Sequence, residues 1–295
     1  MSGTLDEGGR ARRKVGSAPA DPRQACSGHA RDFRSDTEFL DGQLNKLALG
    51  PCGVGPGGLL SCDFLDYSLS SAFQPIFSVS DRMPHSHEAL LRAQTTSQRA
   101  VSPVELFERA SQARVERKLD RAARLLHVAN FYAQRASGAR LFLNVDGRHI
   151  EKKDVSHGEF FAAALAGLGL KADAITIEIL ESSIDDFEAL MAAVASFKAF
   201  GFRIAIDDFG ARHSNLDRVW RLEPDYVKID RSLVVDAAAN ARARIVLRKV
   251  VEIVHELGAL VICEGIETVD HEKTVLDCGT DFLQGYLYGR PSAAI

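Results

Sequence analysis

The stretch "RIAIDDFGARHSNL", residues 203 to 216, decides the fold and raises the question of function. Its apolar start is typical of a buried strand, which ends at two adjacent carboxylates, Asp207 and Asp208, followed by a glycine. Like charges side by side are unfavourable unless something positive lies between them. The stretch therefore predicts a strand whose end holds a positive group.

A related pattern recurs from about residue 70: a helical stretch, a glycine suited to a helix C-terminus, a β-rich run and then polar residues. Examples are "LAGLGLKADAITIEILE" (165–181), "FKAFGFRIAIDDFG" (197–210), "HELGALVICEGIE" (255–267) and "LDCGTDFLQGYLYG" (276–289). Alternating helices and strands favour a parallel sheet that is covered on its outside. Roughly 225 residues of this kind fit a β/α barrel better than a small open sheet.

Polar residues stand at the carboxyl ends of these predicted strands. In a barrel those ends face one mouth, so the side chains are expected to converge. A carboxylate flanked by apolar residues, such as Glu178 in "ITIEILE", is costly unless it is paired or bound to a metal. A helix N-cap or a salt bridge explains any one of them alone, but agreement over six strands favours a shared site. The residues are Asn144, Glu178, Asp207 with Asp208, Lys228, Glu264 and Gln284.

Several carboxylates with an amide and one lysine form the oxygen-rich, negative pocket that Mg²⁺ or Mn²⁺ prefers. Two such ions about 4 Å apart would explain the adjacent aspartates and would activate a shared water. Hydrolysis of a phosphate ester is the natural use of such a site. Arg92 in "EALLR" is a candidate phosphate clamp, and a structural ion pair is the alternative reading.

Two other enzyme classes fit these residues less well. "DFG" (208–210) is also a magnesium-binding motif of protein kinases, but the chain has none of the other kinase signatures. A barrel glycosidase needs only two carboxylates and leaves the amide and the lysine unexplained.

The start of the chain differs in amino-acid composition from the rest. Eleven of the 23 glycines and four of the nine prolines fall within the first 58 residues, so we expect a mostly irregular extension over residues 1–68 before a domain at 69–295. Within the extension, Ser35 and Glu38 have capping-box spacing, which favours one short amphipathic helix that could dock a protein partner. Its apolar stripe is Phe39, Leu40, Leu44 and Leu47.

Two binding motifs in the extension are weak. "GVGPGG" (53–58) has the spacing of a nucleotide loop, but no predicted strand precedes it and Pro56 interrupts it. Zinc ligands could come from Cys26, His29, Cys52 and Cys62, although scattered free thiols are the simpler interpretation.

The chain as a whole predicts a cytoplasmic protein that binds neither nucleic acid polymers nor membranes. Its formal charge of −4 gives no general attraction to polyanions. Five scattered cysteines do not resemble a disulfide framework, and no apolar run reaches the length of a membrane span.

Taken together, these residues resemble the EAL-domain phosphodiesterases, which cut the bacterial messenger cyclic di-GMP. The resemblance spans residues 73 to 291 and rests on motifs in the order of that family. They are "FQPIF" (73–77), "EALLR" (88–92), "LFLNV" (141–145), "IEILE" (177–181), "DDFG" (207–210), "YVKID" (226–230), "CEGIE" (263–267) and "QGYLYGRP" (284–291).

The resemblance implies a modified TIM-type (β/α)8 barrel with its first strand antiparallel, and cyclic di-GMP opened to linear pGpG with two Mg²⁺ or Mn²⁺ ions. It implies metal ligands at Glu88, Asn144, Glu178, Asp207 and Asp208. It implies a general base or further ligand at Glu264, with Lys228 steadying the attacking water and Gln284 beside it. Substrate contacts are implied at Gln74, Arg92 and Gln284, and loop-supporting acids at Glu181 and Glu267. A homodimer is implied as well.

One departure from the family lies after the paired aspartates. The family usually reads D-D-F-G-T-G, whereas this chain has "DDFGAR", so Ala211 loses a hydroxyl and Arg212 replaces a glycine. If that glycine used a positive φ, the strain would be roughly 1 kcal/mol. The alternative function is therefore a receptor that binds cyclic di-GMP without cutting it and signals through protein contacts.

Overall fold

The structure is a computed structural model that describes residues 42–43, 52–55, 58–134, 139–145, 157–180, 186–211 and 216–295. All of these belong to one compact unit, residues 33–295. The predicted stripe of Phe39, Leu40, Leu44 and Leu47 lies outside the described residues, as do Cys26 and His29.

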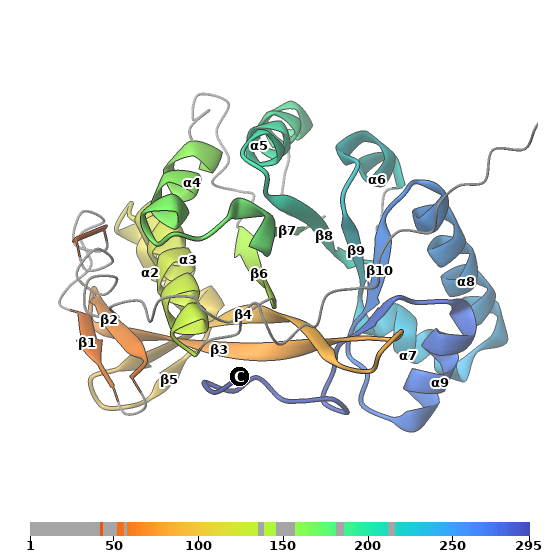
Figure 1. Ribbon diagram of the computed structural model, residues 1–295. Helices are drawn as coiled ribbons and strands as arrows, with labels where there is room; N and C mark the ends of the chain where they lie inside the picture. The colour runs from red at the N-terminus through yellow and green to blue at the C-terminus, as the bar shows by residue number, and fades with distance from the viewer. Residues whose placement is uncertain are drawn as a thin grey trace, which may run out of the picture. The chain divides into compact units, whose positions relative to one another are not determined.

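Eight strands close into a barrel, which confirms the predicted fold (Figure 1). The first barrel strand, β3, pairs antiparallel with both of its neighbours, and the other neighbouring pairs are parallel. The barrel strands are β3 (Tyr67–Ser78), β4 (Pro84–Thr95), β6 (Arg140–Val145), β7 (Ile175–Leu180), β8 (Arg203–Phe209), β9 (Tyr226–Ile229), β10 (Leu260–Cys263) and β11 (Phe282–Leu283).

Helices cover the outside of the strands (Figure 1). Several begin where sequence rules place a start: Asp186 caps α5, Asp230 caps α7 and Thr268 caps α9 with side-chain oxygens. The helices are α2 (Pro103–Gln112), α3 (Glu116–Ala133), α4 (His157–Gly167), α5 (Phe187–Ala199), α6 (Leu216–Leu222), α7 (Arg231–Ala239), α8 (Ala241–Glu256) and α9 (Val269–Cys278), with the 3-10 turn η3 (Ala172–Ala174). No helix of the described part is both long and apolar enough to cross a bilayer.

Three short strands extend the sheet beyond the barrel. β1 (Cys52–Val54) and β2 (Leu60–Phe64) form a hairpin on β3, and β5 (Ala100–Val101) pairs with β4. In the described part of "GVGPGG", Gly53 and Val54 belong to β1 and Gly55 donates to the Leu59 carbonyl. The next described element is the strand β2, whereas a phosphate loop would lead into a helix.

The expectation that all cysteines are free thiols was wrong for one pair. Cys52 and Cys62 are directly opposite in the β1–β2 pairing and form a disulfide, which removes both from the zinc hypothesis. Cys263 and Cys278 are free and buried.

The barrel interior is layered, and this layering positions the site. A plug of apolar side chains fills one level: Ile76, Phe142, Ala205, Tyr226, Ile262 and Phe282. Strand side chains alternate between the two faces, so the residue two positions away from each plug residue also faces inward. On β6, β8, β9 and the exits of β10 and β11, that residue lies toward the carboxyl end and is polar.

Candidate metal centre

Every barrel strand contributes one polar side chain to the level above the apolar plug. Because β3 is antiparallel, its contribution precedes its plug residue in sequence, and Gln74 is therefore two positions before Ile76. The eight residues, from β3 around to the exit of β11, are Gln74, Glu88, Asn144, Glu178, Asp207, Lys228, Glu264 and Gln284. The convergence predicted from the strand ends is therefore present.

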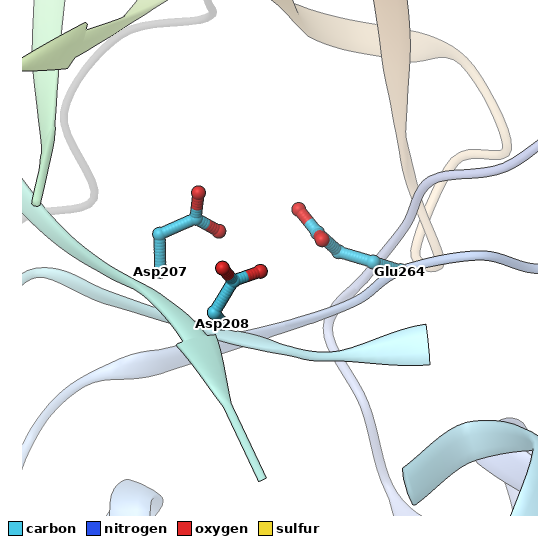
Figure 2. Close-up of side chains that lie close together, drawn as sticks. All are labelled: Asp207, Asp208 and Glu264. Atoms are coloured by element: carbon cyan, nitrogen blue, oxygen red, sulfur yellow. The ribbon is translucent and has the colours of Figure 1, made fainter. Parts of the chain in front are cut away.

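Asp207 and Asp208 are consecutive, so regular alternation would send them to opposite faces. The register of β8 against β9 shifts between Ile206 and Phe209, and Asp208 adopts a φ of 58°. A non-glycine residue in this left-handed region is uncommon, and aspartate is among those that tolerate it. The irregularity allows both carboxylates to face the site, where they approach Glu264 (Figure 2).

Lys228 is the central cation of the site and is almost completely buried. Its Nζ lies 2.7 Å from Glu178 Oε1, 3.1 Å from Asp207 Oδ1 and 3.3 Å from Glu88 Oε2. It also lies 2.5 Å from Glu264 Oε1. One ammonium thus faces four carboxylates, and Asp208 adds a fifth acid nearby, so the cluster holds more negative than positive charge.

Amide side chains fix the orientation of Glu88. Asn144 Nδ2 donates to Glu88 Oε1 at 3.0 Å, and Gln284 Nε2 donates to Glu88 Oε2 at 2.6 Å. Gln284 Nε2 also lies 3.4 Å from Gln74 Oε1, and Gln74 Nε2 donates to the Gly289 carbonyl at 3.1 Å. These contacts hold Glu88 from both sides.

Burial and mutual repulsion favour protons on most of these acids. Burial raises the pKa of Glu264 to about 8 against the opposing effect of Lys228, and burial together with Asp207 raises the pKa of Asp208 to about 6. Burial, with Glu88 nearby, also raises the pKa of Glu178. Glu88 differs: Lys228 and the donated hydrogen bonds outweigh burial and lower its pKa. The raised pKa values follow from several buried carboxyl groups sharing a single ammonium.

The residues fit divalent cations. Oxygens of Asp207, Asp208 and Glu264 lie within 4.8 Å of one another. Glu178 is completely buried, and its Oε2 has no hydrogen-bond partner in the described part of the chain. A buried carboxylate oxygen without a partner is unfavourable, and a hard cation with oxygen ligands would satisfy it.

Three predicted site residues, Arg92, Glu181 and Glu267, lie apart from this cluster or outside the described chain. Arg92 is exposed, and its Nη1 donates to the Leu91 carbonyl at 3.1 Å. Glu267 forms an exposed ion pair with Arg231 at 3.1 Å. Glu181 and Arg212 fall outside the described residues.

Arg231 was missed by the sequence reasoning, although it directly follows the "YVKID" motif. Its side chain lies against Gly265, where a Cβ would approach Arg231 Cγ to 2.2 Å. Arg231 therefore supports the loop that carries Glu264. The signal available in the sequence was a glycine next to a site acid.

The model of the EAL domain family matches residues 63–291. The chain belongs to the EAL domain family. This EAL domain is similar to the probable cyclic di-GMP phosphodiesterase PdeA of Escherichia coli strain K12, with 34% identity over 41% of this chain and 17% of PdeA. It is also similar to the cyclic di-GMP phosphodiesterase NbdA of Pseudomonas aeruginosa, with 27% identity over 77% of this chain and 29% of NbdA. The chain thus spans less than a third of either relative.

A solved structure similar to this EAL domain is Klebsiella pneumoniae BlrP1 in a manganese and cyclic di-GMP complex. It has a TM-score of 0.70 and 25% identity, over 84% of this chain and 60% of BlrP1. Bacillus subtilis YkuI, an EAL-domain protein solved with cyclic di-GMP and calcium, has a TM-score of 0.65 and 26% identity, over 77% of this chain and 55% of YkuI.

Proposed function

We propose that this EAL domain hydrolyses cyclic di-GMP to linear pGpG with two Mg²⁺ or Mn²⁺ ions. The observation that carries the proposal is the complete ring of polar side chains, one from each barrel strand, with an excess of buried carboxylate. Relatives named as phosphodiesterases of this messenger and structures solved with it support the substrate.

The proposed metal ligands are Glu88, Asn144, Glu178, Asp207 and Asp208. When bound, two divalent ions would screen the phosphodiester and lower the pKa of water. Among the chain's own groups, Lys228 would position the attacking water by donating hydrogen bonds to it. Glu264 would accept a proton from that water, because its carboxylate lies beside the Lys228 ammonium that would hold the water.

The remaining predicted residues would act at the edges of the site. Gln74 and Arg92 are proposed to contact the substrate, and Arg92 has a guanidinium suited to a phosphate. Gln284 would hold Glu88, whereas Glu181 and Glu267 would support the neighbouring loops. The Arg231 ion pair of Glu267 is consistent with that supporting role.

The test is turnover of cyclic di-GMP by purified protein with Mn²⁺ or Mg²⁺, with the product identified by chromatography. Glu88→Ala should abolish conversion to pGpG because it removes a proposed ligand. Glu252→Ala is the matched control, since that acid lies in an exposed ion pair on α8. Absence of turnover by the unmodified chain with either metal would refute the proposal.

A second candidate is a cyclic di-GMP receptor without hydrolysis, and the departure at Ala211 and Arg212 favours it. Calorimetry would distinguish the two, because a receptor would bind the dinucleotide tightly while product stayed absent. A homodimer, and a protein partner docked on the N-terminal extension, are proposed with either function. Analytical ultracentrifugation tests the dimer.

A cytoplasmic location is also proposed. The free thiols of Cys263 and Cys278 support it, whereas the Cys52–Cys62 disulfide is the observation against it. Thiol trapping in intact cells, followed by mass spectrometry, would show whether Cys52 and Cys62 are reduced in place.

A further inference from the structure

The segment after β11 lies along β3 and is fixed to it at several points. The ring of Tyr288 packs on Phe77 with 5.1 Å between centroids. A Cβ on Gly289 would approach Pro75 Cγ to 2.8 Å, so only glycine allows this proximity. Farther along, Ser292 exchanges two backbone hydrogen bonds with the opposing residue of β3, at 2.7 and 3.0 Å. The segment therefore follows β3 closely.

The hydroxyl of Tyr288 anchors this segment to α9. It donates to Glu272 Oε1 at 2.7 Å, and Glu272 has a side-chain exposure of only 20%. Hydrogen bonds to a charged acceptor are stronger than neutral ones. Burial and Glu272 raise the pKa of Tyr288, so the hydroxyl keeps its proton and remains a donor at neutral pH.

A continuous chain of contacts connects this anchor with the metal centre. The carbonyl of Gly289, the residue after Tyr288, accepts from Gln74. Gln74 Oε1 in turn faces Gln284 Nε2, which donates to Glu88. The position of the Gly289 carbonyl thus orients two buried amides, and these amides orient a carboxylate of the site.

We propose that Tyr288 is a positioning residue, whose hydrogen bond to Glu272 holds the segment that aligns Gln74, Gln284 and Glu88. The inference rests on the proposed function, since it assigns Glu88 to metal binding. Tyr288 touches neither the metal nor the substrate in this account. It acts through the Gly289 carbonyl.

The experiment compares Tyr288→Phe with Tyr286→Phe in the full chain. Tyr288→Phe removes the hydroxyl and keeps the ring on Phe77. Tyr286→Phe removes a hydroxyl from an exposed ring in the same segment. This ring has the guanidinium of Arg290 at 4.1 Å from its centroid, and Tyr286 also has a minor electrostatic interaction with Arg231. Calorimetric titration with Mn²⁺ alone should show a 3- to 10-fold weaker affinity for Tyr288→Phe, and the affinity of Tyr286→Phe should equal that of the unmodified chain.

A second variant separates positioning from general stabilisation. Glu272→Gln keeps a side-chain oxygen that can accept from Tyr288 but removes the charge, so we expect an Mn²⁺ affinity between those of the unmodified chain and Tyr288→Phe. Thermal unfolding without metal is measured in parallel. A purely structural hydroxyl would lower the melting temperature and leave the Mn²⁺ affinity unchanged, which would overturn the proposal.

The two proposals fail in different ways. If the unmodified chain binds Mn²⁺ but does not convert cyclic di-GMP, the phosphodiesterase proposal fails and the affinity comparison still decides the role of Tyr288. Equal Mn²⁺ affinities of Tyr288→Phe and Tyr286→Phe refute the positioning role even when turnover is found. Absence of Mn²⁺ binding by the unmodified chain refutes both.

Discussion

Lys228 is buried to 1% exposure and lies within ion-pair distance of four carboxylates. A buried ammonium is strongly disfavoured unless its partners compensate for lost hydration. The surrounding acids raise the pKa of Lys228 far enough to outweigh burial. In the absence of a divalent ion, this one residue therefore keeps the acids together.

Replacing Lys228 by methionine tests that role. Lys228→Met leaves buried carboxylates without their cation, so the free energy of unfolding without metal should fall by about 3 kcal/mol, with protonation of Glu264 limiting the loss. Mn²⁺ should restore more stability to this variant than to the unmodified chain, because it replaces the missing positive charge. Denaturant titration with and without Mn²⁺ measures both effects.

Lys249→Met serves as the control for this experiment. Lys249 forms an exposed ion pair with Glu252, so its loss should change the free energy of unfolding by less than about 1 kcal/mol. Equal stability of the two variants without metal would show that the central ammonium is dispensable for the fold.

The inward position of a candidate site residue was predictable wherever a polar residue interrupts an apolar strand at its carboxyl end. Glu178 and Lys228 stand out in this way, because strand alternation and barrel geometry together place them. The inward position of Asp208 was not predictable from alternation, since it depends on a local φ of 58°. Arg231 was missed because its role comes from contact with a loop 34 positions away at Gly265.

Among the elements, the exits of β10 and β11 lie against each other. Ile266 donates to the Gln284 carbonyl at 3.1 Å, and Leu287 donates to the Ile266 carbonyl at 3.0 Å. Gly285 lies between these contacts, where an added Cβ would come within 2.2 Å of the Ile266 backbone oxygen. The two loops that carry Glu264 and Gln284 thus form one unit.

Gly285→Ala should separate these loops. Because the clash is with backbone, we expect a loss of about 3 kcal/mol or more in the free energy of unfolding, together with weaker Mn²⁺ binding. Gly258→Ala is the control: its φ is 84° and no atom lies within 4 Å of the added Cβ, so strain of about 1 kcal/mol is its only cost. Denaturant titration and calorimetry measure both variants. Similar losses of unfolding free energy in the two variants would show that the Ile266 backbone does not pack tightly against Gly285.

The contact between α3 and β3 contains a titratable group outside the site. His127 is buried, and its Nδ1 lies 2.8 Å from Ser71 Oγ. Burial, with a smaller effect of Arg92, lowers the pKa of His127 to about 3. The imidazole is therefore neutral in the folded protein at neutral and mildly acidic pH.

The pKa of His127 differs between the folded and the unfolded chain, and this makes the free energy of unfolding depend on pH. In the unfolded chain His127 takes up a proton below about pH 6.5, while the folded chain does not, so acid favours unfolding. The contribution of His127 is complete above that pH and should fall by about 2 kcal/mol between pH 6.5 and 5. His127→Asn keeps a polar partner for Ser71 without titrating, so its free energy of unfolding should decline less over this range. Parallel slopes in denaturant titrations would contradict the buried, neutral imidazole.

The elements themselves were predicted unevenly. The alternating helices and strands of the barrel were predictable. Helices and strands have different hydrophobic periods, and glycines mark the C-terminal ends of helices. The β1–β2 hairpin was not predicted as sheet, because glycine-rich composition conceals strands that are only three and five residues long. Their pairing depends on β3, which the local sequence does not reveal.

For the whole molecule, the N-terminal boundary of the folded domain depends on whether the β1–β2 hairpin belongs to it. The boundary predicted at residue 69 would exclude β1 and β2, whereas the family match begins at residue 63. Asn130, which is 1% exposed on α3, accepts from the Leu60 amide at 2.6 Å and donates to the Leu60 carbonyl at 2.9 Å. This pair of hydrogen bonds ties β2 to the outer layer of the barrel.

Two truncations locate the boundary. A chain starting at residue 51 keeps both strands and should unfold at the same denaturant concentration as the full chain. A chain starting at residue 66 removes Leu60 and Phe64, whose burial contributes roughly 1.5–3 kcal/mol each, and leaves Asn130 Oδ1 without the Leu60 donor. We therefore expect the shorter chain to lose several kcal/mol of unfolding free energy. Mn²⁺ should still stabilise it, because the proposed ligands do not include residues of the hairpin. Equal stability of the two truncations would instead support a domain that starts at residue 69, and it would show that the β1–β2 hairpin does not stabilise the barrel.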